Sequence, residues 1–220
     1  MKQAGRPIDA SVEQVKVVAF DCDGVLFDSK EANVRFYDHV LAHVGGQPVR
    51  ADQRQYIHMH TVQESLLHLL GEGESYHAAM DYCRALDFHE FNRYLQCEPG
   101  LVETLAWAKH RFHVALATNR TISTRDVLAY FDLDRYFDLV VSAADVEYPK
   151  PHPGVMDRIL TTFAVTPQQV VYVGDSAVDE QLAAVTGGGA APSDPGGVFR
   201  HDLPAARTTR PLWPWLAMTI

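Results

Sequence analysis

The pattern of apolar positions along the chain predicts a parallel sheet covered by helices. Four short runs are almost continuously apolar and rich in β-branched residues, which is typical of strands buried on both faces. These runs span residues 15–20, 112–117, 137–142 and 170–174. Stripes of apolar residues at helical spacing lie between the later runs. This alternation predicts an α/β fold with a three-layer α/β/α, Rossmann-like core.

One long segment, residues 29–97, interrupts the alternation because it reads as helix throughout. An amphipathic stripe covers residues 34–44 and ends at a pair of glycines. Thr61 and Glu64 then have the spacing of a capping box that opens a second helix. A long mixed stretch, residues 74–96, completes the segment. The sequence therefore predicts an all-helical insert within the sheet-forming part of the chain.

The insert divides the chain into two expected domains. We expect a discontinuous core of residues 12–28 and 98–220, and a helical domain of residues 29–97. The start of the chain reads as a loose arm. Residues 187–197 are rich in glycine and lack the apolar strand that would close the sheet. Residues 212–216 contain two tryptophans, which fit packing on the core or on a partner.

Composition narrows the partners and the location. The chain has 220 residues and a net charge of −9. An acidic surface repels nucleic acid and anionic lipid, so neither is an expected partner. The three cysteines have no metal-ligand spacing, and their odd number argues against a disulfide framework, which favours a reducing compartment. No apolar run has the length of a signal peptide core or a membrane helix. We therefore expect a cytoplasmic protein, either a monomer or a homodimer.

Acidic residues directly follow two of the predicted strands. Asp21 and Asp23 follow the first strand, where Gly24 allows the backbone to turn, and Asp175 follows the last. Asp179 comes one helical turn after Asp175, so the two can share a side. The carboxyl ends of parallel strands meet at one edge of a sheet. Like charges about 4 Å apart repel by about 4 kcal/mol per pair at an effective dielectric of 20. A hard dication such as Mg²⁺ would relieve this repulsion.

The other two strands are followed by polar and cationic residues. Thr118 and Asn119 follow the second strand, and Lys150 lies in the loop after the third. Pro149 and Pro151 flank this lysine and restrict the backbone that aims it. We expect the lysine to supply a positive charge opposite the acids.

These residues, in this order, resemble the motifs of the haloacid dehalogenase superfamily. The motifs are Asp21-x-Asp23-Gly24-Val25-Leu26-x-Asp28-Ser29, Thr118-Asn119, Lys150-Pro151-x-Pro153 and Gly174-Asp175-Ser176-x-x-Asp179. The resemblance covers roughly residues 15–187 and is strongest with the phosphatase and phosphomutase branch, which includes phosphoglycolate phosphatases. That branch carries a helical cap after the first motif, so the resemblance implies that residues 29–97 are a cap that selects the substrate.

The resemblance also implies a role for each matched residue. Asp21 would be the nucleophile that forms an aspartyl-phosphate. Asp23 would protonate the leaving oxygen and then take a proton from water. Lys150 would neutralise charge on the phosphoryl group. The implied catalytic residues are Asp21, Asp23, Thr118 and Lys150; the implied phosphate-binding residues are Thr118, Asn119, Lys150 and Gly24; the implied Mg²⁺ ligands are Asp21, Asp23, Asp175 and Asp179.

The expected function is Mg²⁺-dependent hydrolysis of a small phosphorylated metabolite. Asp23 favours phosphate esters over organohalides, because a halide leaving group needs no proton whereas an alkoxide does. Phosphoglycolate-like acids and sugar phosphates are both compatible with the sequence. A phosphomutase with the same chemistry, a phosphate-responsive regulatory domain and a catalytically weak scaffold remain alternatives. Residues 61–63 lack the basic residue that sugar-phosphate mutases tend to carry there, which weakens the mutase alternative.

Three further features could be functional or merely structural. His58 and His60 are two residues apart, so on a helix they do not form the usual metal-binding pair. Either of them, or Thr61, could instead contact substrate or simply pack. Cys22 lies between the two aspartates, but alternation along an extended segment points it away from them. We therefore expect a buried structural thiol rather than a nucleophile.

Overall fold

A computed structural model describes residues 15–121, 123–187, 197–199 and 206–207. The expected N-terminal arm, most of the glycine-rich segment 187–197 and the tryptophan pair at 212–216 lie outside the described residues.

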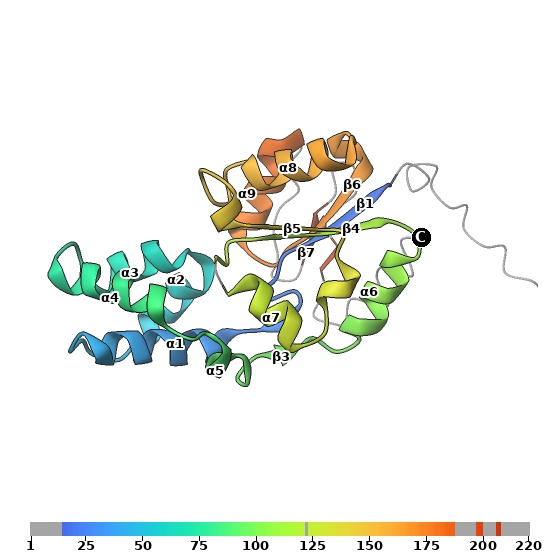
Figure 1. The fold of residues 1–220 in the computed structure, drawn as a ribbon. Helices are drawn as coiled ribbons and strands as arrows, with labels where there is room; N and C mark the ends of the chain where they lie inside the picture. Colours follow the sequence, from blue (N-terminus) through green and yellow to red (C-terminus); the bar gives the residue numbers. More distant parts are fainter. Residues whose placement is uncertain (1–14, 122, 188–196, 200–205, 208–220) are drawn as a thin grey trace, which may run out of the picture.

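A parallel sheet forms the centre of the core, as the apolar runs predict (Figure 1). Its strands are β1 (Val17–Phe20), β4 (His113–Thr118), β5 (Leu139–Ser142) and β6 (Val170–Val173), in the order β5-β4-β1-β6. β1 pairs in parallel with both β4 and β6, and β4 pairs in parallel with β5. Because β1 is central, all four of its residues are buried.

Helices cover both faces of this sheet, which confirms the three-layer α/β/α fold (Figure 1). Val18 and Phe20 of β1 pack with α6 and α7. The alternate residues Val17 and Ala19 pack on the other side with α8 and α9. Full burial on both faces explains why β1 is apolar without alternation. The bounds are α6 Leu101–Lys109, α7 Thr124–Tyr130, α8 Gly154–Phe163 and α9 Ala177–Gly187, with short 3₁₀ turns η3 Asp134–Tyr136, η4 Ala143–Asp145 and η5 Pro167–Gln169.

Two short strands extend the sheet beyond the expectation from the sequence. β7 (Gly197–Phe199) pairs antiparallel with β6, and β8 (Ala206–Arg207) pairs antiparallel with β7. The complete sheet is therefore mixed rather than parallel throughout. Segments of two or three residues are too short for an apolar periodicity to reveal.

The chain between β2 and β3 is helical, as expected, and lies beside the sheet as a helical lobe (Figure 1). Its apolar residues form a cluster of their own that includes Phe36, Val40 and Leu66. The predicted capping box forms, because the backbone N–H of Thr61 donates to Glu64 Oε2 over 2.9 Å. The elements are β2 Phe27–Asp28, α1 Lys30–His43, η2 Ala51–Gln53, α2 Arg54–Met59, α3 Val62–Leu70, α4 Glu74–Ala85, α5 His89–Asn92 and β3 Gln96–Cys97.

The end of the helical lobe differs from the expected long helical stretch over residues 74–96. That stretch divides into α4 and α5, and it ends in β3. β3 pairs antiparallel with β2, placing Phe27 opposite Cys97 and Asp28 opposite Gln96. The two segments that join the lobe to the core are thereby tied together. None of the helices in the described ranges is long and apolar enough to cross a membrane.

Candidate active site

The polar residues that follow the four parallel strands meet at one edge of the sheet. A cavity of about 490 Å³ opens there between the core and the helical lobe. The residues that line it include Asp21, Asp23, Thr118, Asn119, Lys150 and Asp175. The structure therefore brings together side chains that come from distant parts of the sequence. Gly24 and Asp179 are the two predicted site residues that stand behind this lining.

Lys150 is buried between two carboxylates. Its Nζ lies 2.8 Å from Asp21 Oδ1 and 2.7 Å from Asp179 Oδ1. Burial alone would lower the pKa of the lysine, but the two carboxylates outweigh it and raise that pKa above its ordinary value. The ammonium group therefore stays charged. Asn119 fixes the lysine backbone, because it accepts from Lys150 N over 2.8 Å and donates to Lys150 O over 3.0 Å.

Asp179 is fully committed to hydrogen bonds within the protein. Its Oδ1 accepts from the Tyr172 hydroxyl over 2.6 Å as well as from Lys150. Its Oδ2 accepts from the Ser176 hydroxyl over 2.6 Å. Burial would raise the pKa of Asp179, but Lys150 and the other donors hold it below the ordinary value. Asp179 is thus a permanent carboxylate that orients the lysine.

Tyr172 is a residue that the sequence analysis missed. Its hydroxyl lies 3.1 Å from Lys150 Nζ, inside the buried part of the site. Burial raises the pKa of this tyrosine well above its ordinary value, so it remains a neutral donor. The sequence did contain a signal for this role, because Tyr172 stands in an otherwise aliphatic strand. A buried tyrosine hydroxyl requires a hydrogen-bond partner, which indicates other polar groups nearby.

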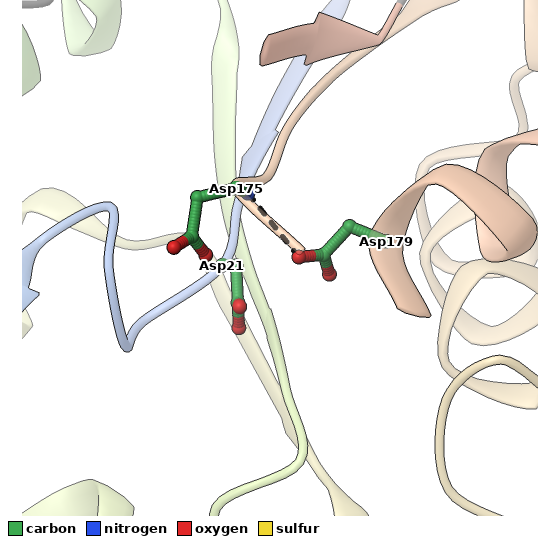
Figure 2. Close-up of side chains that lie close together, drawn as sticks. All are labelled: Asp21, Asp175 and Asp179. Carbon is green, nitrogen blue, oxygen red and sulfur yellow. Dashed lines mark hydrogen bonds between the residues drawn. The ribbon is translucent and has the colours of Figure 1, made fainter. Parts of the chain in front are cut away.

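Asp21 and Asp175 carry charge that the protein does not fully balance. Figure 2 shows their carboxyl groups close together, with Asp179 reaching toward them from α9. One oxygen from each of the three acids lies within 4.8 Å of the others. Burial, followed by repulsion from Asp179, raises the pKa of Asp21 well above its ordinary value despite Lys150. The same two causes raise the pKa of Asp175 to about 7.

The donor set fits a hard divalent cation. Asp21, Asp23, Asp175 and Asp179 are accompanied in the site by three cationic side chains, those of Lys150, Arg120 and Lys30, which still leaves a formal excess of negative charge. Carboxylate oxygens are the ligands that Mg²⁺ prefers, and it tolerates a site that leaves room for water. The free oxygens of Asp21 and Asp175 could hold such an ion, whereas those of Asp179 are already occupied.

Arg120 is the second residue that the sequence analysis missed. Its Nε and Nη2 donate to the two carboxylate oxygens of Asp23, each over 2.7 Å. The side chains of the pair are only 14% and 18% exposed. Burial would raise the pKa of Asp23, but Arg120 outweighs it and lowers that pKa. The sequence signal was a cation directly after Thr118 and Asn119 at the end of a buried strand.

Gly24 makes room for Asp175. Its φ is +81°, a conformation that residues with a Cβ rarely adopt. A Cβ at this position would collide with the carboxyl group of Asp175. The backbone turn at Gly24 therefore leaves the space in which the carboxyl group of Asp175 packs.

The helical lobe supplies the opposite wall of the cavity. His58 and His60 line the cavity, whereas Thr61 does not and instead caps α3. His58 Nδ1 lies 3.1 Å from Asn33 Nδ2, and burial lowers the pKa of this histidine. Asn92 also lines the cavity, and its buried Nδ2 has no hydrogen-bond partner. Cys22 is fully buried in the core cluster, as expected for a structural thiol.

Comparison with known proteins identifies similarity over most of the chain. Residues 18–188 match the family model described as haloacid dehalogenase-like hydrolase. A phosphoglycolate phosphatase of Nitrosococcus oceani is 26% identical over 182 residues, which cover 78% of this chain and 80% of that protein. A phosphorylated carbohydrates phosphatase of Thermotoga maritima is 29% identical, with 79% of this chain and 82% of that protein covered.

A solved structure is similar over nearly the whole chain. The haloacid dehalogenase-superfamily hydrolase of subfamily IA from Geobacter sulfurreducens has a TM-score of 0.70 and is 31% identical. The alignment covers 94% of this chain and 97% of that one.

Replacing Gly24 by alanine should displace Asp175 and thereby weaken binding of a divalent cation. Gly45→Ala is a matched control, because Gly45 has a similar φ of +72° but open space around it. Each substitution should cost about 1–2 kcal/mol of stability through the left-handed backbone. Mg²⁺ should raise the unfolding midpoint of the wild type and of Gly45→Ala, but not of Gly24→Ala. An equal Mg²⁺ effect on both variants would contradict the cation site.

Proposed function

The chain belongs to the haloacid dehalogenase-like hydrolases, and from this we propose that it hydrolyses a small phosphate monoester through an aspartyl-phosphate on Asp21. The observation that carries the proposal is the meeting of Asp21, Asp175 and the buried Lys150 at the wall of one cavity. The names of the relatives support a phosphate ester as the substrate class. Phosphoglycolate-like acids and phosphorylated carbohydrates both fit those names.

Asp21 is the group best placed to attack phosphorus. It lines the cavity, and a single protein cation, Lys150, lies 2.8 Å from its Oδ1. The carboxylate would displace the ester oxygen, and water would then hydrolyse the resulting acyl phosphate. Lys150 would offset charge on the phosphoryl oxygens. The Thr118 hydroxyl and the main-chain amide of Asn119 would hold those oxygens in line for attack.

Mg²⁺ is the cation that we propose for the acidic cluster. The carboxylates of Asp21 and Asp175 and the main-chain carbonyl of Asp23 would hold it. When bound, it would supply positive charge to the nucleophilic carboxylate and to the phosphoryl group. Asp179 would act by fixing Lys150, since both of its oxygens are occupied.

Asp23 would serve as the acid and then the base. Its carboxyl group lines the same cavity as Asp21, two residues along the chain. It would protonate the departing ester oxygen and later accept a proton from the attacking water. Both of its oxygens are bound to Arg120, so this role requires the pair to separate.

We further propose that residues 29–97 form a cap over a core of residues 12–28 and 98–220. The separate apolar cluster of the helical lobe and the β2–β3 ladder at its base support this division. The cap would select the substrate through the cavity wall and exclude water during turnover. Three unpaired cysteines support a cytoplasmic location.

Asp21→Asn should abolish turnover of a generic aryl phosphate, with a loss of about 10⁴-fold or more in kcat, because an amide is a poor nucleophile. The unfolding midpoint should stay the same or rise, since a buried repulsion is removed. Asp157→Asn, an exposed site on α8, is the control and should leave kcat unchanged. Retention of activity in Asp21→Asn would contradict the nucleophile assignment.

Removal of divalent cations should stop hydrolysis reversibly. Treatment with EDTA followed by gel filtration should leave less than about 1% of phosphate release, because an uncompensated acidic cluster repels the substrate. Added Mg²⁺ should restore the rate. Continued turnover in the metal-free protein would show that Lys150 alone offsets the negative charge of the acids and the phosphoryl group. The proposed role of the cation would then be wrong.

Asn92→Leu should weaken binding of the best substrate found in a phosphate-release screen. Loss of the free amide should raise KM about tenfold, while kcat for an aryl phosphate changes less than about twofold. Stability should be unchanged or slightly higher, because an unsatisfied buried donor disappears. A large loss of stability with unchanged KM would instead assign Asn92 a structural role.

A further inference from the structure

The ion pair between Asp23 and Arg120 blocks the proposed acid. Arg120 occupies both oxygens of the carboxylate in a bidentate arrangement. A carboxyl group that accepts from a guanidinium at both oxygens is held in its ionised form, and an ionised carboxylate carries no proton to donate to a departing ester oxygen. Both residues line the cavity, so a bound ligand can reach the pair. Turnover of an ester with a poor leaving group therefore requires Asp23 to leave Arg120.

Arg120 cannot lose Asp23 without receiving another anion. The Arg120 side chain is only 14% exposed, and a buried charge that loses its partner is strongly destabilising. Apart from Asp23, the side-chain hydrogen bond of Arg120 goes to the neutral Ser123 hydroxyl, over 3.4 Å. Of the other acids that line the cavity, Asp21 is bound to Lys150 and Asp175 is a proposed ligand of the divalent cation. The replacement anion must therefore come from the ligand.

We propose that Arg120 binds a second anionic group of the substrate and thereby releases Asp23, which takes up a proton from water and then donates it to the departing ester oxygen. This inference rests on the proposed function and deepens it, because it defines the substrate class. The phosphoryl group would lie at Asp21 and Lys150, so the anion at Arg120 is a different group. This second anionic group must lie close to the ester oxygen, because Asp23 contacts Arg120 and, in its role as the acid, must also reach the ester oxygen. A planar carboxylate matches the fork of a guanidinium best.

The substrate is therefore a short phosphate monoester that carries a carboxylate beside the ester carbon. Esters of uncharged alcohols would bind without breaking the Asp23–Arg120 pair, and their slow step would be protonation of the leaving oxygen. The pair thus couples selection of the substrate to assembly of the acid. Arg120 is a specificity-determining residue in this scheme, and it also positions Asp23.

The test compares two esters of similar size, 2-phosphoglycolate and 2-hydroxyethyl phosphate, in Mg²⁺. The wild type should prefer 2-phosphoglycolate by about 100-fold in kcat/KM. Arg120→Gln should lower kcat/KM for 2-phosphoglycolate by about 100-fold. The same variant should raise kcat for 2-hydroxyethyl phosphate several-fold, because Asp23 is then free. Arg125→Gln removes the same charge from the exposed face of α7 and should alter neither value.

The outcomes separate this inference from the proposed function. 4-Nitrophenyl phosphate needs no acid, so its Mg²⁺-dependent hydrolysis tests the proposed function alone. If that activity is present but the wild type treats the two alkyl esters alike, only the role of Arg120 is wrong. An equal loss of activity toward both esters in Arg120→Gln would likewise leave it a structural residue. Should Arg120→Gln fail to fold, Arg120→Lys keeps the charge without the fork and should reduce the preference for 2-phosphoglycolate about tenfold.

Discussion

The buried ammonium of Lys150 is the interaction on which the site depends. It lies within 2.8 Å of Asp21 and within 2.7 Å of Asp179, which come from opposite ends of the sequence. A charge this deep is stable only with well-placed partners. The surrounding residues supply them: Asn119 fixes the lysine backbone, and Tyr172 donates to the carboxylate that holds the lysine side chain. The parallel sheet makes this possible, because it brings the ends of β1, β4 and β6 to one edge.

The same site contains more negative than positive charge, and this imbalance suits a site that binds a cation. Asp21 has a raised pKa although Lys150 touches it, and the pKa of Asp175 is raised to about 7. A protein that only needed stability would replace such acids by neutral residues. The excess negative charge costs folding free energy, and a divalent cation would recover it on binding. The two acids that remain poorly compensated are those with free oxygens facing the cavity.

Much of the core and of the site could be predicted from the sequence, for identifiable reasons. β1 and β6 are apolar on both faces, so the sequence marks where each strand ends. Asp21 and Asp175 follow shortly after those ends, which places the acidic residues of the motifs at the edge of the sheet. Pairs of residues that meet only in three dimensions were not predictable. Arg120 meets Asp23 across 97 positions, and no local pattern marks that contact. Asn92 was missed because an unpaired amide is recognised only when its surroundings are known. The two-residue strands β2 and β3 likewise lack any period to detect.

The two ion pairs of the site differ in how easily they can be exchanged. Lys150 has two carboxylate partners and a phenolic one, so the loss of any single contact leaves the ammonium compensated. Arg120 has one carboxylate partner, Asp23, and otherwise a neutral hydroxyl. A ligand anion at Lys150 therefore has to compete with several protein partners, whereas at Arg120 it has to displace only the carboxylate of Asp23. In the proposed function, the sheet edge would therefore stay constant during turnover, while Arg120 at the cavity wall would respond to the ligand. This asymmetry would place the chemistry on the core strands and the discrimination between substrates at the junction with the helical lobe.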